Sequence, residues 1–397
     1  MSTASLTRRW DLRGVSLMAF AHGASDLYSG VLPFVLFYDV ARAGLPAWCQ
    51  GALAFAWYLT SSVAQPLVGA YSDRRGRWWF LPASVALTAV AVSAAAATAS
   101  MAVLVACVVL GGLGSAVMHP EAGRYSALLG GTRRASAISI YQIGGQVGYG
   151  IGPIVAAVLL AHAGGGAAVA MAVPGVLAAL GVAALMPAFA RDADAVAPRH
   201  TARFSFGQVD HVAIGFLVAS TALRYLTAAA FAFYLPNLLS ARGLPLTASG
   251  AIVTAFLIAA ALGLYAGGAG ADRFGARRVA VLGLLLSVPP LLAGLALHGA
   301  PAVVALLIGS ALLAVQNAPG VTLAQELLPR HLGTALGLMN GVAFGIGSLG
   351  VALIGVVVTR AGADAALTLA ALAPLPAALA YLVLRPRSPQ EEPRRDA

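Results

Sequence analysis

The sequence predicts an all-α integral membrane protein whose twelve transmembrane helices form two pseudo-symmetric six-helix bundles. The composition is the first reason: 60% of the 397 residues are apolar and 10% are charged, whereas a soluble domain has about 45–50% apolar and about 25% charged residues. The second reason is that the apolar residues lie in long runs, each near the ~20 residues of a membrane-spanning helix. The third is that both halves of the chain carry the same loop motif. This composition excludes a soluble enzyme, a nucleic-acid-binding protein and a disordered scaffold.

Twelve apolar runs follow one another along the chain, separated by Gly, Pro and Arg clusters. In the first half they cover 14–40, 48–71, 79–99, 101–128, 136–162 and 167–189. In the second half they cover 210–238, 247–270, 278–297, 301–327, 334–358 and 364–384. The first run follows Arg8, Arg9 and Arg13, as in a secretory signal peptide. It continues to about Phe37 without a clear cleavage site, so we interpret it as a retained span.

The longest polar stretch between two runs lies in the middle of the chain, at residues 190–208. It predicts a cytoplasmic linker between two domains. These are an N-terminal six-helix bundle at 1–189 and a C-terminal six-helix bundle with a cytoplasmic tail at 209–397. Cys49 and Cys107 lie inside apolar runs with no Cys or His at metal-ligand spacing. We therefore expect no disulfide, no metal site and no cofactor.

All 24 basic residues are Arg, and their distribution predicts the orientation in the membrane. With twelve spans, 19 of them lie on one side, in the terminal segments, the linker and the loops after even-numbered spans. Arg42, Arg242 and Arg360 lie on the other side, and Arg124 and Arg224 lie inside spans. Because the cytoplasmic side carries the excess of Arg, we expect both termini in the cytoplasm. The net charge of +10 therefore sets the topology and does not indicate a nucleic-acid partner.

The loop motif Gly-x-x-x-Asp-Arg-x-Gly follows the second span of each half, with Asp73 and Asp272 at 199 positions from each other. Half the chain is about 198 residues, so the motif indicates duplication of a six-span unit. Its glycines allow close helix approach and a tight turn, and its charges form a candidate conformational latch. The alternative is that these charges only set the topology. The latch candidates are Gly69, Asp73, Arg74, Gly76, Arg77, Gly268, Asp272, Arg273 and Gly275.

The fifth span carries a second glycine pattern, which includes Gly144, Gly148, Gly152 and Pro153. Small residues at four-residue spacing form a flat helix face for close packing, and Pro153 allows a kink. The repeated loop motif resembles the signature of the major facilitator superfamily, over the whole chain. This resemblance implies a central cavity between the bundles and alternating access. The glycine pattern resembles the antiporter motif of drug-exporting members, which favours export, although glycine-rich packing faces also occur in importers.

Three further segments resemble the fosmidomycin-resistance branch of that superfamily, a group of bacterial inner-membrane efflux carriers. They are His22–Asp26 in span one, His119–Arg124 in span four and Ser139–Gln146 in span five. The resemblance implies a phosphonate-type or otherwise anionic drug among the possible substrates. Span four departs from the general drug-exporter pattern, because Val108 stands where that pattern has a buried Arg. Proton coupling through that Arg is therefore not implied here.

Charged side chains inside the spans indicate the mechanism, because each costs about 2.5–3.5 kcal/mol or more in lipid. Asp26 lies midway along span one, one turn after His22, and His119, Glu121 and Arg124 lie in the cytoplasmic half of span four. A carboxylate in a low-dielectric cavity can hold and release a proton near neutral pH. We predict Asp26 and Glu121 as proton-coupling residues, with His22 and His119 as tuning or relay groups. The alternative for Glu121 is a static ion pair with Arg124.

Arg224 lies near the middle of span seven. A central Arg is a bidentate partner for carboxylate, phosphate or phosphonate, so we predict that Arg224 binds substrate. An equal alternative is that it pairs with Asp26 across the bundle interface, and both roles hold in turn if substrate displaces the carboxylate. The other substrate-binding candidates are cavity amides and aromatics, each of which could instead join helices or belong to the interfacial belt: Tyr28, Gln142, Gln146, Tyr225, Gln316, Asn317 and Asn340.

These features predict a secondary transporter that exports a small organic compound or drug in exchange for protons. One alternative is an importer or facilitator of a small organic anion on the same fold. A different class, a membrane-embedded sensor or enzyme, is disfavoured because the sequence shows no nucleophile–base pair or metal set. The expected partners are the lipid bilayer, a small-molecule substrate and protons, without nucleic acid. We expect a monomer in the bacterial inner membrane.

Overall fold

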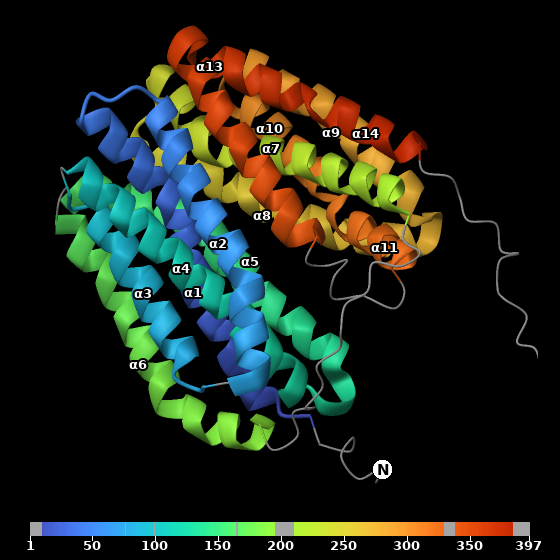
Figure 1. Ribbon diagram of the computed structural model, residues 1–397. Helices are drawn as coiled ribbons and strands as arrows, with labels where there is room; N and C mark the ends of the chain where they lie inside the picture. The colour runs from blue at the N-terminus through green and yellow to red at the C-terminus, as the bar shows by residue number, and fades with distance from the viewer. Residues whose placement is uncertain are drawn as a thin grey trace, which may run out of the picture.

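The computed structural model describes residues 10–75, 77–98, 100–163, 166–194, 210–328 and 338–383, and this part of the chain is helical without strands (Figure 1). The first half contains α1 (Leu12–Arg42), α2 (Trp48–Arg75), α3 (Phe80–Ala95), α4 (Met101–Leu129), the 3₁₀ turn η2 (Gly131–Arg133), α5 (Arg134–Ala163) and α6 (Ala167–Asp194). The second half contains α7 (His211–Ala241), α8 (Leu246–Phe274), α9 (Ala276–Ala296), α10 (Gly299–Ala314), α11 (Asn317–Leu327), the π-helical turn η4 (Leu338–Val342), α13 (Ala343–Leu372) and α14 (Pro374–Val383).

The described helices account for the twelve predicted spans. Eight helical segments in this part of the chain are long and apolar enough to cross a membrane. One of them, residues 343–381, contains two spans because the chain turns at Gly362, where φ is 84°. The three remaining spans are α1, α2 and α3. Helices α1 and α2 have 31 and 28 residues and contain more polar side chains, and α3 has 16 residues. The prediction of an all-α membrane protein is confirmed.

Span ten agrees with its prediction in extent, because residues 299–327 form one segment that is long and apolar enough to cross a membrane. Its helix is interrupted at Val315 and Gln316, between α10 and α11, although both residues keep right-handed helical backbone angles. Pro319 lies four residues after Val315 and has no N–H to donate to the Val315 carbonyl, so that hydrogen bond of the helix is missing. The corresponding Pro120 of the first half is accommodated inside the continuous helix α4.

The turn after the first helix of each half is also repeated. Gly44 after α1 and Gly243 after α7 both have left-handed backbones, with φ of 63° and 78°, a conformation that glycine adopts readily at a helix end. Arg42 and Arg242 each donate to a main-chain carbonyl between the third and fourth helices of their own half, at 2.8 Å and 3.2 Å. The duplication therefore extends beyond the loop motif to the opposite end of the bundles.

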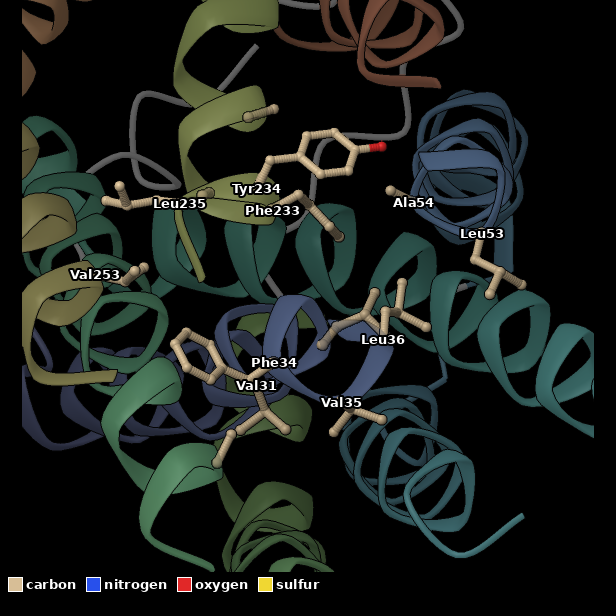
Figure 2. Packing of buried hydrophobic residues seen from close by; sticks show 14 of the residues in the cluster. Val31, Phe34, Val35, Leu36, Leu53, Ala54, Phe233, Tyr234, Leu235 and Val253 are labelled. Atoms are coloured by element: carbon tan, nitrogen blue, oxygen red, sulfur yellow. The ribbon is translucent and has the colours of Figure 1, made fainter. Parts of the chain in front are cut away.

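Buried apolar side chains show how the two halves meet. We call the end with Arg13, Arg77 and Arg273 the Arg-rich end, and the end with Arg42 and Arg242 the Arg-poor end. At the Arg-poor end one cluster joins both halves, and Figure 2 shows Val31, Phe34, Val35, Leu36, Leu53, Ala54, Phe233, Tyr234, Leu235 and Val253 of it. At the Arg-rich end each half has its own cluster, around Met18, Leu81 and Tyr125 in one and around Leu217, Leu284 and Leu313 in the other. The halves thus share a core at one end and have separate cores at the other.

The most extensive contacts between the described parts of the two halves are those of α2 with α13 and of α5 with α8. The main-chain N–H of Trp48 in α2 donates to Oγ1 of Thr359 in α13 at 2.9 Å. The main-chain N–H of Ile154 in α5 donates to Oγ1 of Thr254 in α8 at 3.1 Å. All four residues lie in the Arg-poor parts of their helices, in agreement with the position of the shared core.

Within the first half, α1 and α5 approach each other at backbone distance. A Cβ at Gly144, Gly148 or Gly152 would lie 2.1, 2.0 or 2.4 Å from a main-chain atom of α1. Main-chain atoms cannot move aside as a flexible side chain can, so only glycine fits at these positions. Pro153 follows inside α5.

We expect Gly148→Ala to destabilise the protein by about 1–3 kcal/mol, because the added methyl group overpacks the contact with α1. Gly181→Ala in α6 is the matched control, because nothing lies within 4 Å of a Cβ there. Its effect should stay within about 0.5 kcal/mol. Thermal unfolding of both purified variants in detergent micelles measures the difference. Equal stability of the two variants would contradict the backbone contact between α1 and α5.

Candidate functional site

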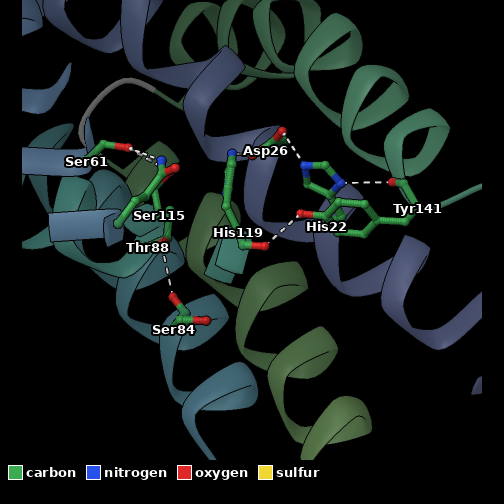
Figure 3. Close-up of polar contacts among 9 residues, drawn as sticks. His22, Asp26, Ser61, Ser84, Thr88, Ser115, His119 and Tyr141 are labelled. Atoms are coloured by element: carbon green, nitrogen blue, oxygen red, sulfur yellow. Dashed lines mark hydrogen bonds and ion pairs between the residues drawn. The ribbon is translucent and has the colours of Figure 1, made fainter. Parts of the chain in front are cut away.

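The N-terminal half contains three ionisable side chains in contact, His22, Asp26 and His119, which we call the His–Asp cluster (Figure 3). His22 and Asp26 are four residues apart on α1 and therefore lie on the same helix face. His22 Nε2 is 3.0 Å from Asp26 Oδ2. His119 comes from α4, and its Nε2 is 3.8 Å from Asp26 Oδ1. The carboxylate thus lies between two imidazole rings from two helices.

Helix α5 fixes the ring of His22. Its Nδ1 lies 2.8 Å from the main-chain oxygen of Tyr141, and the two rings stack with their centroids 4.1 Å apart. A Cβ at Gly145, one turn later on α5, would lie 2.4 Å from the imidazole. The Tyr141 hydroxyl also donates to the main-chain oxygen of His119 at 3.2 Å. The same turn of α5 therefore positions groups from both α1 and α4.

The His–Asp cluster is more exposed on its α4 side than on its α1 side. The exposed fraction of the side chain is 6% for His22, 15% for Asp26 and 33% for His119. Among the described residues, it is the one group of three or more His, Cys, Asp or Glu side chains with ligand atoms within 4.8 Å of one another. The 3.0 Å between His22 and Asp26 is a hydrogen-bond distance. A proton between these atoms therefore satisfies both of them without a metal ion.

The second predicted carboxylate, Glu121, lies on a different face of α4. It is two residues after His119, a spacing that points two helical side chains in different directions. Its side chain is fully buried. Arg124 lies one turn further on, with its guanidinium carbon 5.0 Å from the centre of the Tyr125 ring. Asp26 rather than Glu121 is the carboxylate that the two imidazole rings contact.

Arg224 is a buried cation in the C-terminal half, with 5% of its surface exposed. Its ionisable neighbours are Tyr225 and Tyr381. Within the described chain it forms no ion pair, and its Nε has no hydrogen-bond partner. Asp26 pairs with His22 in this conformation. The described structure therefore does not contain the Asp26–Arg224 pair that the sequence offered as an alternative.

Polar and aromatic side chains surround the same region of the C-terminal half. Gln316 donates from Nε2 to a threonine hydroxyl of α7 at 3.3 Å and to the hydroxyl of Tyr381. Tyr225 stacks on Phe344, with centroids 4.1 Å apart, and meets Tyr58 of α2 edge-on at 5.5 Å. The Tyr58–Tyr225 contact crosses from one half of the protein to the other.

The remaining substrate-binding candidates lie in different environments. Tyr28 is buried in the N-terminal half, where its hydroxyl donates to a main-chain oxygen of α6 at 2.6 Å. Gln142 and Gln146 are exposed on α5, and Asn317 is half-buried at the start of α11. These four side chains form no hydrogen bond with the His–Asp cluster in the part of the chain that the structure describes. The side chain of Asn340 lies outside the described residues.

The second copy of the loop motif lies at the Arg-rich end. Asp272 and Arg273 are exposed in the last turn of α8, and Gly275 ends the helix with φ of 87°. Gly268 lies inside the same helix. In the first copy Arg77 is exposed. The side chains of Gly69, Asp73 and Arg74, and Gly76 as a whole, lie outside the described residues.

Sequence reasoning assigned no role to Tyr141 or Gly145. The sequence does indicate their position through spacing. Tyr141, Gly145 and Gly148 are separated by four and three residues, so they lie on one face of α5. That face carries the packing glycines and contacts α1, which holds His22.

Comparisons with known proteins agree on one family. The model of the Major Facilitator Superfamily matches residues 15–215 and 217–397. The chain is 30% identical over 92% of its length to the Uncharacterized MFS-type transporter YfnC of Bacillus subtilis, covering 91% of that protein. It is also 30% identical over 82% of its length to the Fosmidomycin resistance protein of Escherichia coli, covering 81% of that protein.

Two solved structures share the fold. A bacterial homolog of the human lysosomal transporter Spinster, in an inward-facing and unoccupied conformation, superposes with a TM-score of 0.76 and 15% identity, over 96% of this chain and 97% of that one. The nucleoside transporter NupG superposes with a TM-score of 0.70 and 15% identity, over 94% and 98%.

Proposed function

Because the chain belongs to the Major Facilitator Superfamily, a family of multi-pass membrane transporters, we propose that it is a proton-coupled efflux transporter of the bacterial inner membrane. In this proposal it exports a small organic anion, such as a fosmidomycin-like phosphonate, in exchange for protons. The relative whose name is Fosmidomycin resistance protein supports this substrate class. Both termini and the Arg-rich end face the cytoplasm, as the distribution of Arg predicts.

One observation carries the proposal: the two halves hold complementary charged sites. The N-terminal half provides Asp26 with two imidazole partners, a site suited to a proton. The C-terminal half provides Arg224, a buried cation without an acidic partner in the described chain, which is suited to an anion. A buried charge without a partner is costly, and a substrate acid group would offset that cost. Proton and anion therefore have separate binding groups in one transporter.

The arrangement of the hydrophobic cores supports alternating access. In this proposal the halves at 1–189 and 209–397 move relative to each other and are joined by the linker at 190–208. The shared core closes the Arg-poor end, whereas the separate cores leave the Arg-rich end free to open. In the proposed cycle, substrate binds from the cytoplasm in this conformation. The Asp272–Arg273 motif and its counterpart in the first half act as a latch when the Arg-rich end closes.

A growth assay tests export. The gene is expressed in a bacterial host that lacks its own exporters, on a panel of anionic and neutral antibiotics that includes fosmidomycin. We expect expression to raise the inhibitory concentration of at least one anionic compound relative to the empty vector, and Asp26→Asn to remove the effect. Increased sensitivity would favour import instead. Unchanged resistance to the whole panel at normal expression would count against export.

A further inference from the structure

We infer that His22 and Asp26 form one proton-binding site that holds a single shared proton, so that His22 is part of the site rather than a relay beside it. The inference concerns the proton site of the proposed transporter. It rests on hydrogen-bond donors and acceptors, beginning with the main chain of α5. Its test needs no substrate, so it succeeds or fails independently of the direction of transport.

The main chain of α5 fixes the tautomer of His22. Its Nδ1 lies 2.8 Å from the main-chain oxygen of Tyr141. A carbonyl oxygen can only accept a hydrogen bond, so Nδ1 must carry a proton. The Nε2 of the neutral ring is then an unprotonated acceptor, and a second proton makes the ring an imidazolium.

The contact between the His22 ring and the Asp26 carboxylate requires one proton. Nε2 of His22 and Oδ2 of Asp26 are 3.0 Å apart. If neither atom carried a proton, the lone pair of the imidazole nitrogen would face a lone pair of the negatively charged carboxylate at hydrogen-bond distance. Neither group could then donate a hydrogen bond to the other. One proton, on either atom, makes this contact favourable and leaves the pair with zero net charge. The two side chains therefore form one binding site for one proton.

The His22 ring is held against turning away from Asp26 by its contacts with α5. The Tyr141 ring stacks on the imidazole, and the backbone at Gly145 leaves no room even for a methyl group. Both residues belong to α5, which packs against α1 through backbone contacts at Gly144 and Gly148. Loss of the shared proton must therefore be met by a movement of helices or by a new partner for the carboxylate.

Ionisable groups on neighbouring helices also interact with Asp26. The described ionisable groups that interact electrostatically with Asp26 from neighbouring helices include His119 of α4, Tyr141 and Tyr149 of α5, and Tyr58 of α2. None of these four groups is a carboxylate. The Nε2 atom of His119 lies 3.8 Å from Asp26 Oδ1. His119 is therefore the imidazole that can replace His22 as the partner of the carboxylate when the shared proton leaves.

The test compares the pH dependence of the unfolding temperature of the purified full-length protein in detergent micelles. Stability depends on pH through the protons that the folded and unfolded states bind. The variants are Asp26→Asn, His22→Gln and the double variant. His162→Gln is the matched control, because His162 is exposed and its Nδ1 makes the same 2.8 Å contact with a main-chain oxygen.

A single shared site predicts that Asp26→Asn and His22→Gln change the pH profile to the same degree and that the double variant changes it no further. His162→Gln should keep the wild-type profile. A His22→Gln profile parallel to the wild type, or two changes that add in the double variant, would overturn the inference. If His22→Gln does not fold, Gly145→Ala displaces the ring while keeping both groups. It should alter the profile, whereas Gly181→Ala should not, and an unaltered Gly145→Ala profile would also overturn the inference.

Discussion

Asp26→Asn is expected to abolish proton-driven accumulation of substrate while leaving the protein folded in the membrane. Asparagine keeps the size of the side chain and can still hydrogen-bond to His22, but it cannot bind or release the shared proton. Energy from the proton gradient would then no longer reach the substrate. Proteoliposomes with an imposed pH gradient and fosmidomycin as the probe measure the loss, which should reduce accumulation to the level of equilibration.

Two comparisons make this prediction specific. Asp364→Asn removes a carboxylate that is 65% exposed and pairs with Arg242 at 3.2 Å, so accumulation should be unchanged. Glu121→Gln tests the other carboxylate that the sequence predicts for proton coupling. If Glu121→Gln abolished accumulation and Asp26→Asn did not, the proton site would lie at Glu121 and the His–Asp cluster would be structural.

Arg224→Lys is expected to weaken binding of an anionic substrate by about tenfold to a hundredfold, equivalent to about 1.5–3 kcal/mol for a hydrogen bond to a charged group. Lysine keeps the positive charge but loses the planar fork that binds two oxygens of a phosphonate or carboxylate. Titration calorimetry with fosmidomycin and with a neutral compound from the growth panel measures both affinities. The neutral compound should lose little.

Arg242→Lys is the matched control for this substitution. Arg242 donates to main-chain carbonyls at the Arg-poor end, so its change should alter stability and leave the affinity for fosmidomycin near that of the wild type. Equal losses of anionic and neutral compounds in Arg224→Lys would contradict direct binding of the anion by Arg224.

The spans could be predicted from the sequence because a bilayer requires long apolar helices, and hydropathy records that requirement locally. The His22–Asp26 contact also follows from local rules, since a spacing of four residues places both side chains on one helix face. The break before α11 was harder to predict. Proline is present in both halves, yet Pro120 stays inside a continuous helix and Pro319 follows a break.

The other contacts of the site depend on how the helices pack against one another, which the spacing of residues along the chain does not determine. Asp26 could have paired with Arg224 by charge alone, but the structure pairs it with two imidazoles of its own half. His119 reaches the carboxylate only because α4 packs against α1. The most informative contact, from His22 to Tyr141, uses a main-chain oxygen that every residue possesses. Its position could not be predicted without the packing of α5.

Transport of fosmidomycin into inverted membrane vesicles under an imposed pH gradient tests the central claim most directly. The lumen of such vesicles corresponds to the outside of the cell, so an acidic lumen should drive the drug inward in exchange for protons. We predict accumulation above the external concentration, abolished by a protonophore and absent in vesicles with Asp26→Asn. Uptake that reaches the same level with and without the gradient would contradict proton-coupled export.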